Sequence, residues 1–132
     1  MSYDPQQLPE AAIRFLTERH LATLSTLRAD GSPHVVPVGF TWDGEHAQAR
    51  VITSGGSVKA RNAALPGARA AVCQLEGRYW LTLEGPVRVL TGPEDVADAE
   101  QRYATRYRPP RENPARVVLL IAVDTILGST PA

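Results

Sequence analysis

The sequence contains a single cysteine, Cys73, and a single lysine, Lys59. One cysteine cannot supply an intramolecular disulfide framework or a cysteine-based zinc site. Acidic and basic residues number 14 each, so the zero net charge favours neither nucleic acid nor an anionic membrane as a partner. No apolar run reaches ~18 residues, the length that a membrane-spanning helix needs. The motifs GxSxG, HExxH, CxxC and GxGxxG are missing, so we expect any reaction to depend on a cofactor.

The length and apolar content are those of one domain with its own core. The chain has 132 residues, of which 43% are hydrophobic. We place the domain at residues 8–128 and expect loose termini at 1–7 and 129–132. Residues 1–10 contain acids, prolines and glutamines where a signal peptide would have a basic start and an apolar centre, so we expect a cytoplasmic protein.

Alternating apolar and polar residues, interrupted by turn signals, predict a protein built mainly of strands. Asp30-Gly31 and Asp43-Gly44 supply the positive φ that tight hairpin turns require. Strands are expected at 20–27, 33–42, 47–53, 69–76, 78–90 and 117–127, and short helices at 9–19, 58–65 and 93–106. The long strand 78–90 should bend at Gly85-Pro86. The expected fold class is mainly β (α+β), a six-stranded antiparallel barrel with three short flanking helices.

A glycine-rich loop between a strand and a helix is the first candidate site. It lies within residues 53–62, with Ser57 as the predicted N-cap of the helix. Free amide groups at a helix start attract anions, and the Lys59 and Arg61 side chains add full charges. Because 13 of the 14 basic residues are arginines, the single lysine stands out. The pattern fits a phosphate site without P-loop spacing, and a capped surface helix with a basic turn is the alternative.

The segment His34–Val38 is the second candidate. Prolines 33 and 37 cannot donate to a strand ladder, so this strand should be bulged or lie at an edge where its backbone can meet a ligand. An ordinary bulged edge strand is the alternative. His34 has no cysteine or acidic partner at metal-ligand spacing, so we expect a solvent-side histidine and no metal site.

Two further segments carry side chains suited to ligands. Arg78-Tyr79-Trp80 offers an aromatic pair that could stack on a planar ligand, although such pairs more often pack in a core or an interface. The stretch from Arg102 to Arg111 holds four arginines near a helix end. Capping of the helix dipole explains some of them, and the remainder fit a carboxylate-binding site better than a nucleic-acid site.

The order of these features resembles the flavin/deazaflavin oxidoreductase superfamily over about residues 8 to 128. The stretches that carry the resemblance are Phe15-Leu-Thr-Glu-Arg-His20, Leu21 to His34, Arg50-Val-Ile-Thr53, Gly55-Gly-Ser-Val-Lys59 and Trp80-Leu-Thr-Leu-Glu-Gly85. The stretches Arg102 to Arg111 and Asn113-Pro-Ala-Arg-Val-Val118 are similar to the B group of that superfamily in particular. The resemblance implies the split β-barrel of pyridoxamine 5′-phosphate oxidase and a homodimer with two cofactors at its interface.

The resemblance also implies a cofactor, a reaction and a set of residues. The cofactor would be coenzyme F420, and hydride transfer from its reduced form would reduce a conjugated small molecule, with biliverdin the expected substrate. His34, Val35, Val36, Pro37 and Val38 would line the deazaflavin ring and ribityl chain. Ile52, Thr53, Ser57, Val58 and Lys59 would take the phosphate region, with Ala60, Arg61 and Asn62 beside it. Trp80 would reach in from the partner subunit, and Arg106, Arg108 or Arg111 would pair with the substrate's carboxylates.

Other functions remain open at this point. An FMN-dependent oxidase or reductase could use the same fold, although Trp80 and the lone Lys59 favour F420. A non-catalytic carrier of F420 or of a tetrapyrrole would bind the ligands without turnover, and a structural dimer would bind neither. No side chain is singled out as a catalytic acid, so the proton may have to come from solvent.

Overall fold

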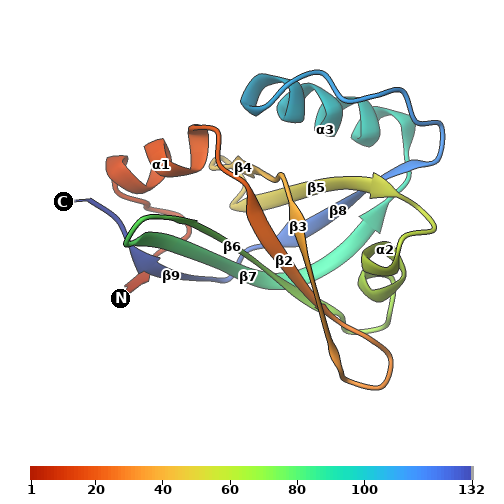
Figure 1. The fold of residues 1–132 in the computed structure, drawn as a ribbon, viewed down its shortest axis with the longest axis horizontal. Coiled ribbons are helices and arrows are strands. Elements are labelled where there is room, and N and C mark those ends of the chain that lie inside the picture. The colour runs from red at the N-terminus through yellow and green to blue at the C-terminus, as the bar shows by residue number, and fades with distance from the viewer. Residues whose placement is uncertain (132) are drawn as a thin grey trace.

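The computed structural model describes residues 1–131 and consists of one antiparallel sheet with three helices around it (Figure 1). The elements are β1 (Ser2–Tyr3), α1 (Glu10–Thr17), β2 (Ala22–Leu27), β3 (Pro33–Val38), β4 (Thr41–Asp43), β5 (Gln48–Ser54), α2 (Val58–Ala63), β6 (Arg69–Glu76), β7 (Tyr79–Leu90), α3 (Pro93–Arg106), β8 (Arg116–Ala122) and β9 (Thr125–Ser129). The strands run in the order β3-β2-β6-β7-β8-β5-β4, with β9 beside β7 and β1 beside β9. This confirms the predicted class, a mainly antiparallel α+β fold consistent with a split barrel.

The predicted count of six strands is wrong, since nine strands lie within residues 1–131. The expected strand 33–42 divides into β3 and β4 because the backbone of Phe40 bonds to side chains instead of a neighbouring strand. The expected strand 117–127 divides into β8 and β9 at residues 123 and 124, whose amides donate to Ala47, in the turn before β5, and to Glu84 of β7.

The predicted loose termini are also wrong for the described residues. Ser2 and Tyr3 pair with Leu127 and Ile126, so the N-terminus forms strand β1 beside β9. The Tyr3 hydroxyl also lies 3.2 Å from Thr130 Oγ1. Ala132 lies outside the described residues. Backbone pairing therefore joins two segments at opposite ends of the chain, which no local sequence pattern predicts.

Strand β7 changes its neighbour at the predicted bend. It pairs with β6 on one side, and on its other side with β9 through residues 80–84 and then with β8 through residues 87–90. Gly85 lies at this exchange, and a Cβ there would collide with the carbonyl oxygen of Ala122. The glycine is needed because the chain between β8 and β9 crosses directly against β7.

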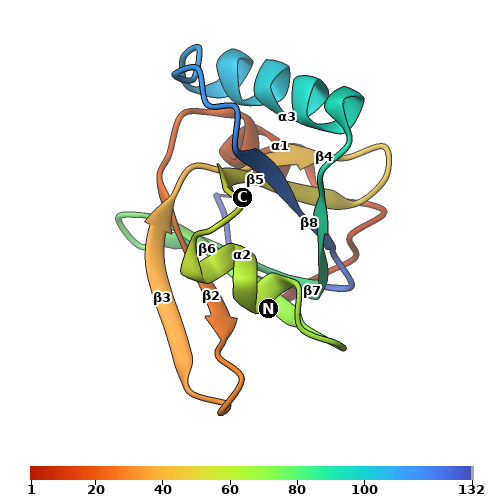
Figure 2. The ribbon, with the colours of Figure 1, turned by 90° about the vertical axis from the view of Figure 1, so that its right-hand side faces the viewer.

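The helices close the open sides of the sheet. Helix α1 packs Phe15 and Leu16 into the core, and α3 lies across β5 and β8 (Figure 2). Strand β8 is buried on both faces, as its continuous apolar run indicates, since Val118 and Leu119 point to opposite faces and both are fully buried. Within residues 1–131, no helix combines the length and the apolar character needed to cross a membrane.

Candidate functional site

A cavity of about 590 Å³ lies between the end of β3, the end of β5, helix α2 and the loop that follows α3. Pro37, Val38 and Gly39 form one wall, and Ile52 and Thr53 lie beside them. Strand β3 is an edge strand of the sheet, as its two prolines predict. The cavity therefore lies where the sheet ladder stops and where backbone groups can face a ligand.

Only part of the predicted segment His34–Val38 lines this cavity. Pro37 and Val38 do, whereas His34 lies further along β3, opposite Thr26 of β2. His34 is half-buried, and its Nδ1 is buried and makes no hydrogen bond within residues 1–131. Val35 is exposed on the outer face of the sheet. The strand thus presents its C-terminal end to the cavity.

The glycine-rich loop confirms the predicted cap and supplies one cation. Ser57 Oγ accepts a hydrogen bond from the Ala60 amide at 3.2 Å and another from Thr53 Oγ1 at 3.1 Å. The Lys59 side chain lines the cavity and is half-buried. The amides of Gly55, Ser57 and Ala60 already donate to protein oxygens, so they are not available to an anion. The Lys59 side chain adds a full positive charge beside the remaining amides of the loop.

The other predicted residues of α2 do not line the cavity. Ala60 and Asn62 are buried against β2, where Asn62 Nδ2 donates to Thr26 Oγ1 at 3.0 Å. Val58 and Arg61 are exposed outside the cavity lining. A helix turns by about 100° per residue, so neighbouring positions face different surroundings. Of the five predicted positions 58–62, the structure therefore brings only Lys59 to the cavity.

The loop after α3 forms the opposite wall. Arg108, Pro109, Pro110 and Arg111 line the cavity, and both arginines are exposed. Asn113 ties the end of this loop to the glycine-rich loop, because its Nδ2 donates to Ser54 Oγ at 2.9 Å. The predicted arginine cluster thus places two guanidinium groups on the cavity wall.

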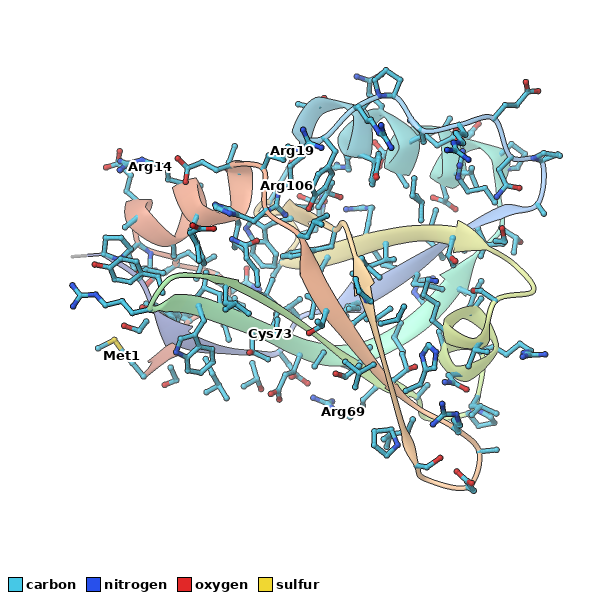
Figure 3. All side chains as sticks on the ribbon, viewed as in Figure 1. Met1, Arg14, Arg19, Arg69, Cys73 and Arg106 are labelled. Atoms are coloured by element: carbon cyan, nitrogen blue, oxygen red, sulfur yellow. The ribbon has the colours of Figure 1, made fainter. Side chains whose placement is uncertain are left out.

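Arg106, the third predicted substrate residue, lies elsewhere. Its side chain is 9% exposed and is buried between α3 and the start of β2 (Figure 3). It donates to the carbonyl oxygens of Glu18 and Phe40 at 2.9 and 2.6 Å and to Gln74 Oε1 at 2.6 Å. Burial lowers the pKa of Arg106, although an arginine keeps its proton at neutral pH. Because these bonds occupy the guanidinium, its observed role is packing, and Arg108 and Arg111 remain as substrate candidates.

Trp80 lies on the outer face of β7, paired across the strands with Leu75, and does not line the cavity of its own chain. Both side chains are exposed. Arg78 donates to the Tyr79 hydroxyl at 3.0 Å, so this pair is occupied within the chain. Neither arrangement shows a ligand site made by one subunit alone.

Seven residues of the cavity lining are absent from the predicted site residues: Gly39, Ser54, Tyr103, Pro109, Pro110, Asn113 and Arg116. Arg116 donates to Glu100 at 2.6 Å, so its charge is balanced by α3. Gly39 gave no turn signal, and a Cβ there would lie about 3.0 Å from the ring of Tyr107. The contact between a strand end and a distant helix was not visible in either local sequence.

A group of possible metal ligands, Asp43, Glu45 and His46, comes together at the β4–β5 turn. Asp43 accepts hydrogen bonds from the amide and ring of His46 and from Arg50 Nη1, and Arg102 Nη2 lies 3.5 Å away. Burial alone would raise the pKa of Asp43, but these hydrogen bonds and the Arg102 charge outweigh it and lower the pKa. Two guanidinium groups already balance this carboxylate, so we assign it a structural role.

The sequence pattern of the family described as pyridoxamine 5′-phosphate oxidase matches residues 8–129. An F420H2-dependent biliverdin reductase from Mycobacterium tuberculosis is 54% identical over 123 residues, which cover 93% of this chain and 89% of that protein. A conserved hypothetical protein of M. tuberculosis, Rv2991, has a similar structure, with a TM-score of 0.79 and 19% identity over 98% of this chain and 89% of its own. A structure described as an F420 reductase has a TM-score of 0.71 and 24% identity over 91% of this chain and 98% of its own.

Proposed function

Because the chain belongs to the pyridoxamine 5′-phosphate oxidase family, we propose that it is an F420H2-dependent oxidoreductase that reduces biliverdin to bilirubin. The observation that carries this proposal is the 54% identity to a biliverdin reductase across 93% of the chain. The expectation drawn from the sequence, an F420-dependent oxidoreductase, agrees with this relative. Its cofactor and substrate are therefore the ones to test first.

The cavity residues fit such a cofactor. Lys59 offers a cation near the loop where a phosphate would lie. Val38 and Ile52 offer apolar surface beside it. When bound, reduced F420 supplies the hydride that the reaction transfers to the central methine of the substrate. The role of the protein is to bind the cofactor and the substrate, to align them with each other and to exclude water.

The proton of the reaction has no obvious donor on this wall. The cavity lining within residues 1–131 contains lysine, arginine and tyrosine but no carboxyl, histidine or cysteine group. Lysine and arginine serve better as charge partners than as acids at neutral pH. We therefore propose that water delivers the proton.

The exposed guanidinium groups of Arg108 and Arg111 support a role in substrate binding. Biliverdin carries two propionates, and a guanidinium pairs with a carboxylate through two parallel hydrogen bonds. Pro109 and Pro110 separate the two arginines and restrict the backbone between them. We propose that these arginines hold the propionates at the cavity.

A homodimer is the proposed assembly. One face of the sheet formed by β3, β2, β6 and β7 carries exposed Leu27, Val35, Leu75 and Trp80, and the strand pairing places them on the same side. Large apolar side chains that are exposed on one face of a sheet favour an interface on that face. A second copy on this face would allow the partner subunit's Trp80 to approach the cofactor site. Sedimentation equilibrium of the wild type and of Val35→Arg tests this: a monomeric wild type would contradict the proposal.

The function itself is tested by titrating the purified protein with F420 and with FMN, followed by a biliverdin turnover assay with reduced F420. Tight F420 binding with turnover supports the proposal. A yellow protein that prefers FMN would instead be a flavin oxidase or reductase. Binding without turnover would indicate a carrier, and binding of neither cofactor a structural dimer. A cytoplasmic location stays a prediction of the sequence.

A further inference from the structure

The buried end of α3 joins the two walls of the cavity. Tyr107 Oη donates to the carbonyl oxygen of His20 at 2.6 Å and accepts from the Phe40 amide at 3.1 Å. Arg106 donates to the carbonyl oxygen of the same Phe40. Phe40, in the interruption between β3 and β4, therefore has its amide and its carbonyl bonded by two consecutive side chains, Arg106 at the end of α3 and Tyr107 at its C-cap.

Each member of this contact is next to a cavity residue. Phe40 follows Gly39 on the strand wall, and Tyr107 precedes Arg108 on the loop wall. Two cation–π contacts add to these hydrogen bonds, since the Arg106 guanidinium carbon lies 4.9 Å from the centre of the Phe40 ring and 5.2 Å from that of the Tyr107 ring. A shift of this contact would therefore change the separation of the two walls.

The Arg106 side chain is held by neutral oxygens. Its three hydrogen bonds go to two backbone carbonyls and to Gln74 Oε1, and Gln74 Nε2 in turn donates to Phe15 O at 2.7 Å. A buried cation held in this way is costly to place, and a hydrophobic residue could fill the space without that cost. What the arginine provides is a fixed orientation of the helix end with respect to three other segments.

We propose that Arg106 and Tyr107, which we call the α3 anchor, are positioning residues that fix the substrate-binding loop Arg108–Arg111 with respect to the strand wall at Gly39. This inference rests on the proposed function for its kinetic consequence. The proposed phosphate residue Lys59 lies on α2, a different element from the one that carries the anchor. Loosening the anchor should therefore affect the substrate and leave cofactor binding largely intact.

Tyr107→Phe tests this, because it keeps the ring and removes only the hydroxyl. Tyr3→Phe is the matched control, since it also removes a hydroxyl that joins distant segments, at Thr130, outside the cavity lining. Both variants should lose comparable thermal stability. We expect the KM for biliverdin to rise about tenfold in Tyr107→Phe alone, the size typical of a small misplacement, with F420 affinity within about twofold of the wild type.

Amide hydrogen exchange gives a readout that does not need activity. In Tyr107→Phe, exchange should accelerate at the amides of Phe40 and Tyr107, which donate to the Tyr107 hydroxyl and to Tyr103 O, and in Tyr3→Phe it should not. If the two variants exchange alike at these amides, or raise KM alike, the α3 anchor is not a positioning device. A wild type without biliverdin turnover would overturn the proposed function, while the exchange data would still decide the anchor.

Discussion

Replacement of Lys59 by alanine should weaken cofactor binding more than any other single loss of charge on this chain. Lys59 is the one residue of α2 that lines the cavity, and it is half-buried there. The amides of Gly55 and Ser57 are engaged by Ala115 O and Ser54 O, so these two amides cannot replace the lost charge. The variant should fold, because the lysine side chain is not part of the buried core.

The size of the effect follows from the kind of bond that is lost. A hydrogen bond to a charged group contributes ~1.5–3 kcal/mol, so the dissociation constant for F420 should rise about 10- to 150-fold. Because Lys59 is only partly buried, salt screens part of the attraction, and the loss should shrink as ionic strength rises. Lys59→Arg, which keeps the charge, should lose much less.

The assay is a fluorescence titration of F420 at two salt concentrations, with Arg88→Ala as the control. Arg88 is an exposed cation on β7 that does not line the cavity, so its removal lowers the net charge equally without touching the site. Equal affinities for Lys59→Ala and the wild type would refute the assignment of Lys59 to the phosphate. Equal losses in both variants would show that only the overall charge matters.

The remaining predictions concern acid, packing and substrate. The pKa of Asp43 is lower in the folded protein than its ordinary value of 3.8, so the ionised carboxylate stabilises the fold at pH values above 3.8. This stabilisation is lost as the pH falls through the lowered pKa of the folded state. The free energy of unfolding, measured as a function of pH in the acid range, should therefore depend less on pH in Asp43→Asn than in the wild type. Gly85→Ala should lose about 1–3 kcal/mol by overpacking or fail to fold, as thermal melts would show. Alanine at Arg108 or Arg111 should raise the KM for biliverdin about 10-fold or more at unchanged F420 affinity. An unchanged KM would show that the replaced arginine does not bind the substrate.

The local elements of this fold were predictable, but some of its junctions were not. Residues 69–76 form β6 at the predicted bounds, and 93–106 form α3, because turn residues and periodicity act within a few positions. Gly85-Pro86 correctly marked the point where β7 changes neighbour. The pairing of β1 with β9 and the division at Phe40 depend on partners far along the chain, so a local pattern cannot indicate them.

The candidate site shows the same limit at the level of single side chains. The sequence indicated the lysine and the proline-broken strand as two separate candidates, and Lys59, Pro37 and Val38 line one cavity. It could not separate Arg106 from Arg108, because composition shows only that a cluster is basic. Their difference is set by position: Arg106 ends the helix and points into the protein, whereas Arg108 lies beyond the cap on an exposed loop.

Helix α2 shows why the site cannot be considered separately from the core. Lys59 faces the cavity, while Ala60 and Ala63 are buried, and Asn62 bonds to Thr26 across the core face of β2. Asn62→Ala leaves the Thr26 hydroxyl buried without that donor, so it should lower the stability of the fold directly. Any loss of F420 affinity should follow from that loss of stability. A loss of F420 binding in Asn62→Ala that disappears well below its melting temperature would show that Asn62 acts only by holding the helix. A loss that persists in the fully folded variant would place Asn62 itself at the ligand.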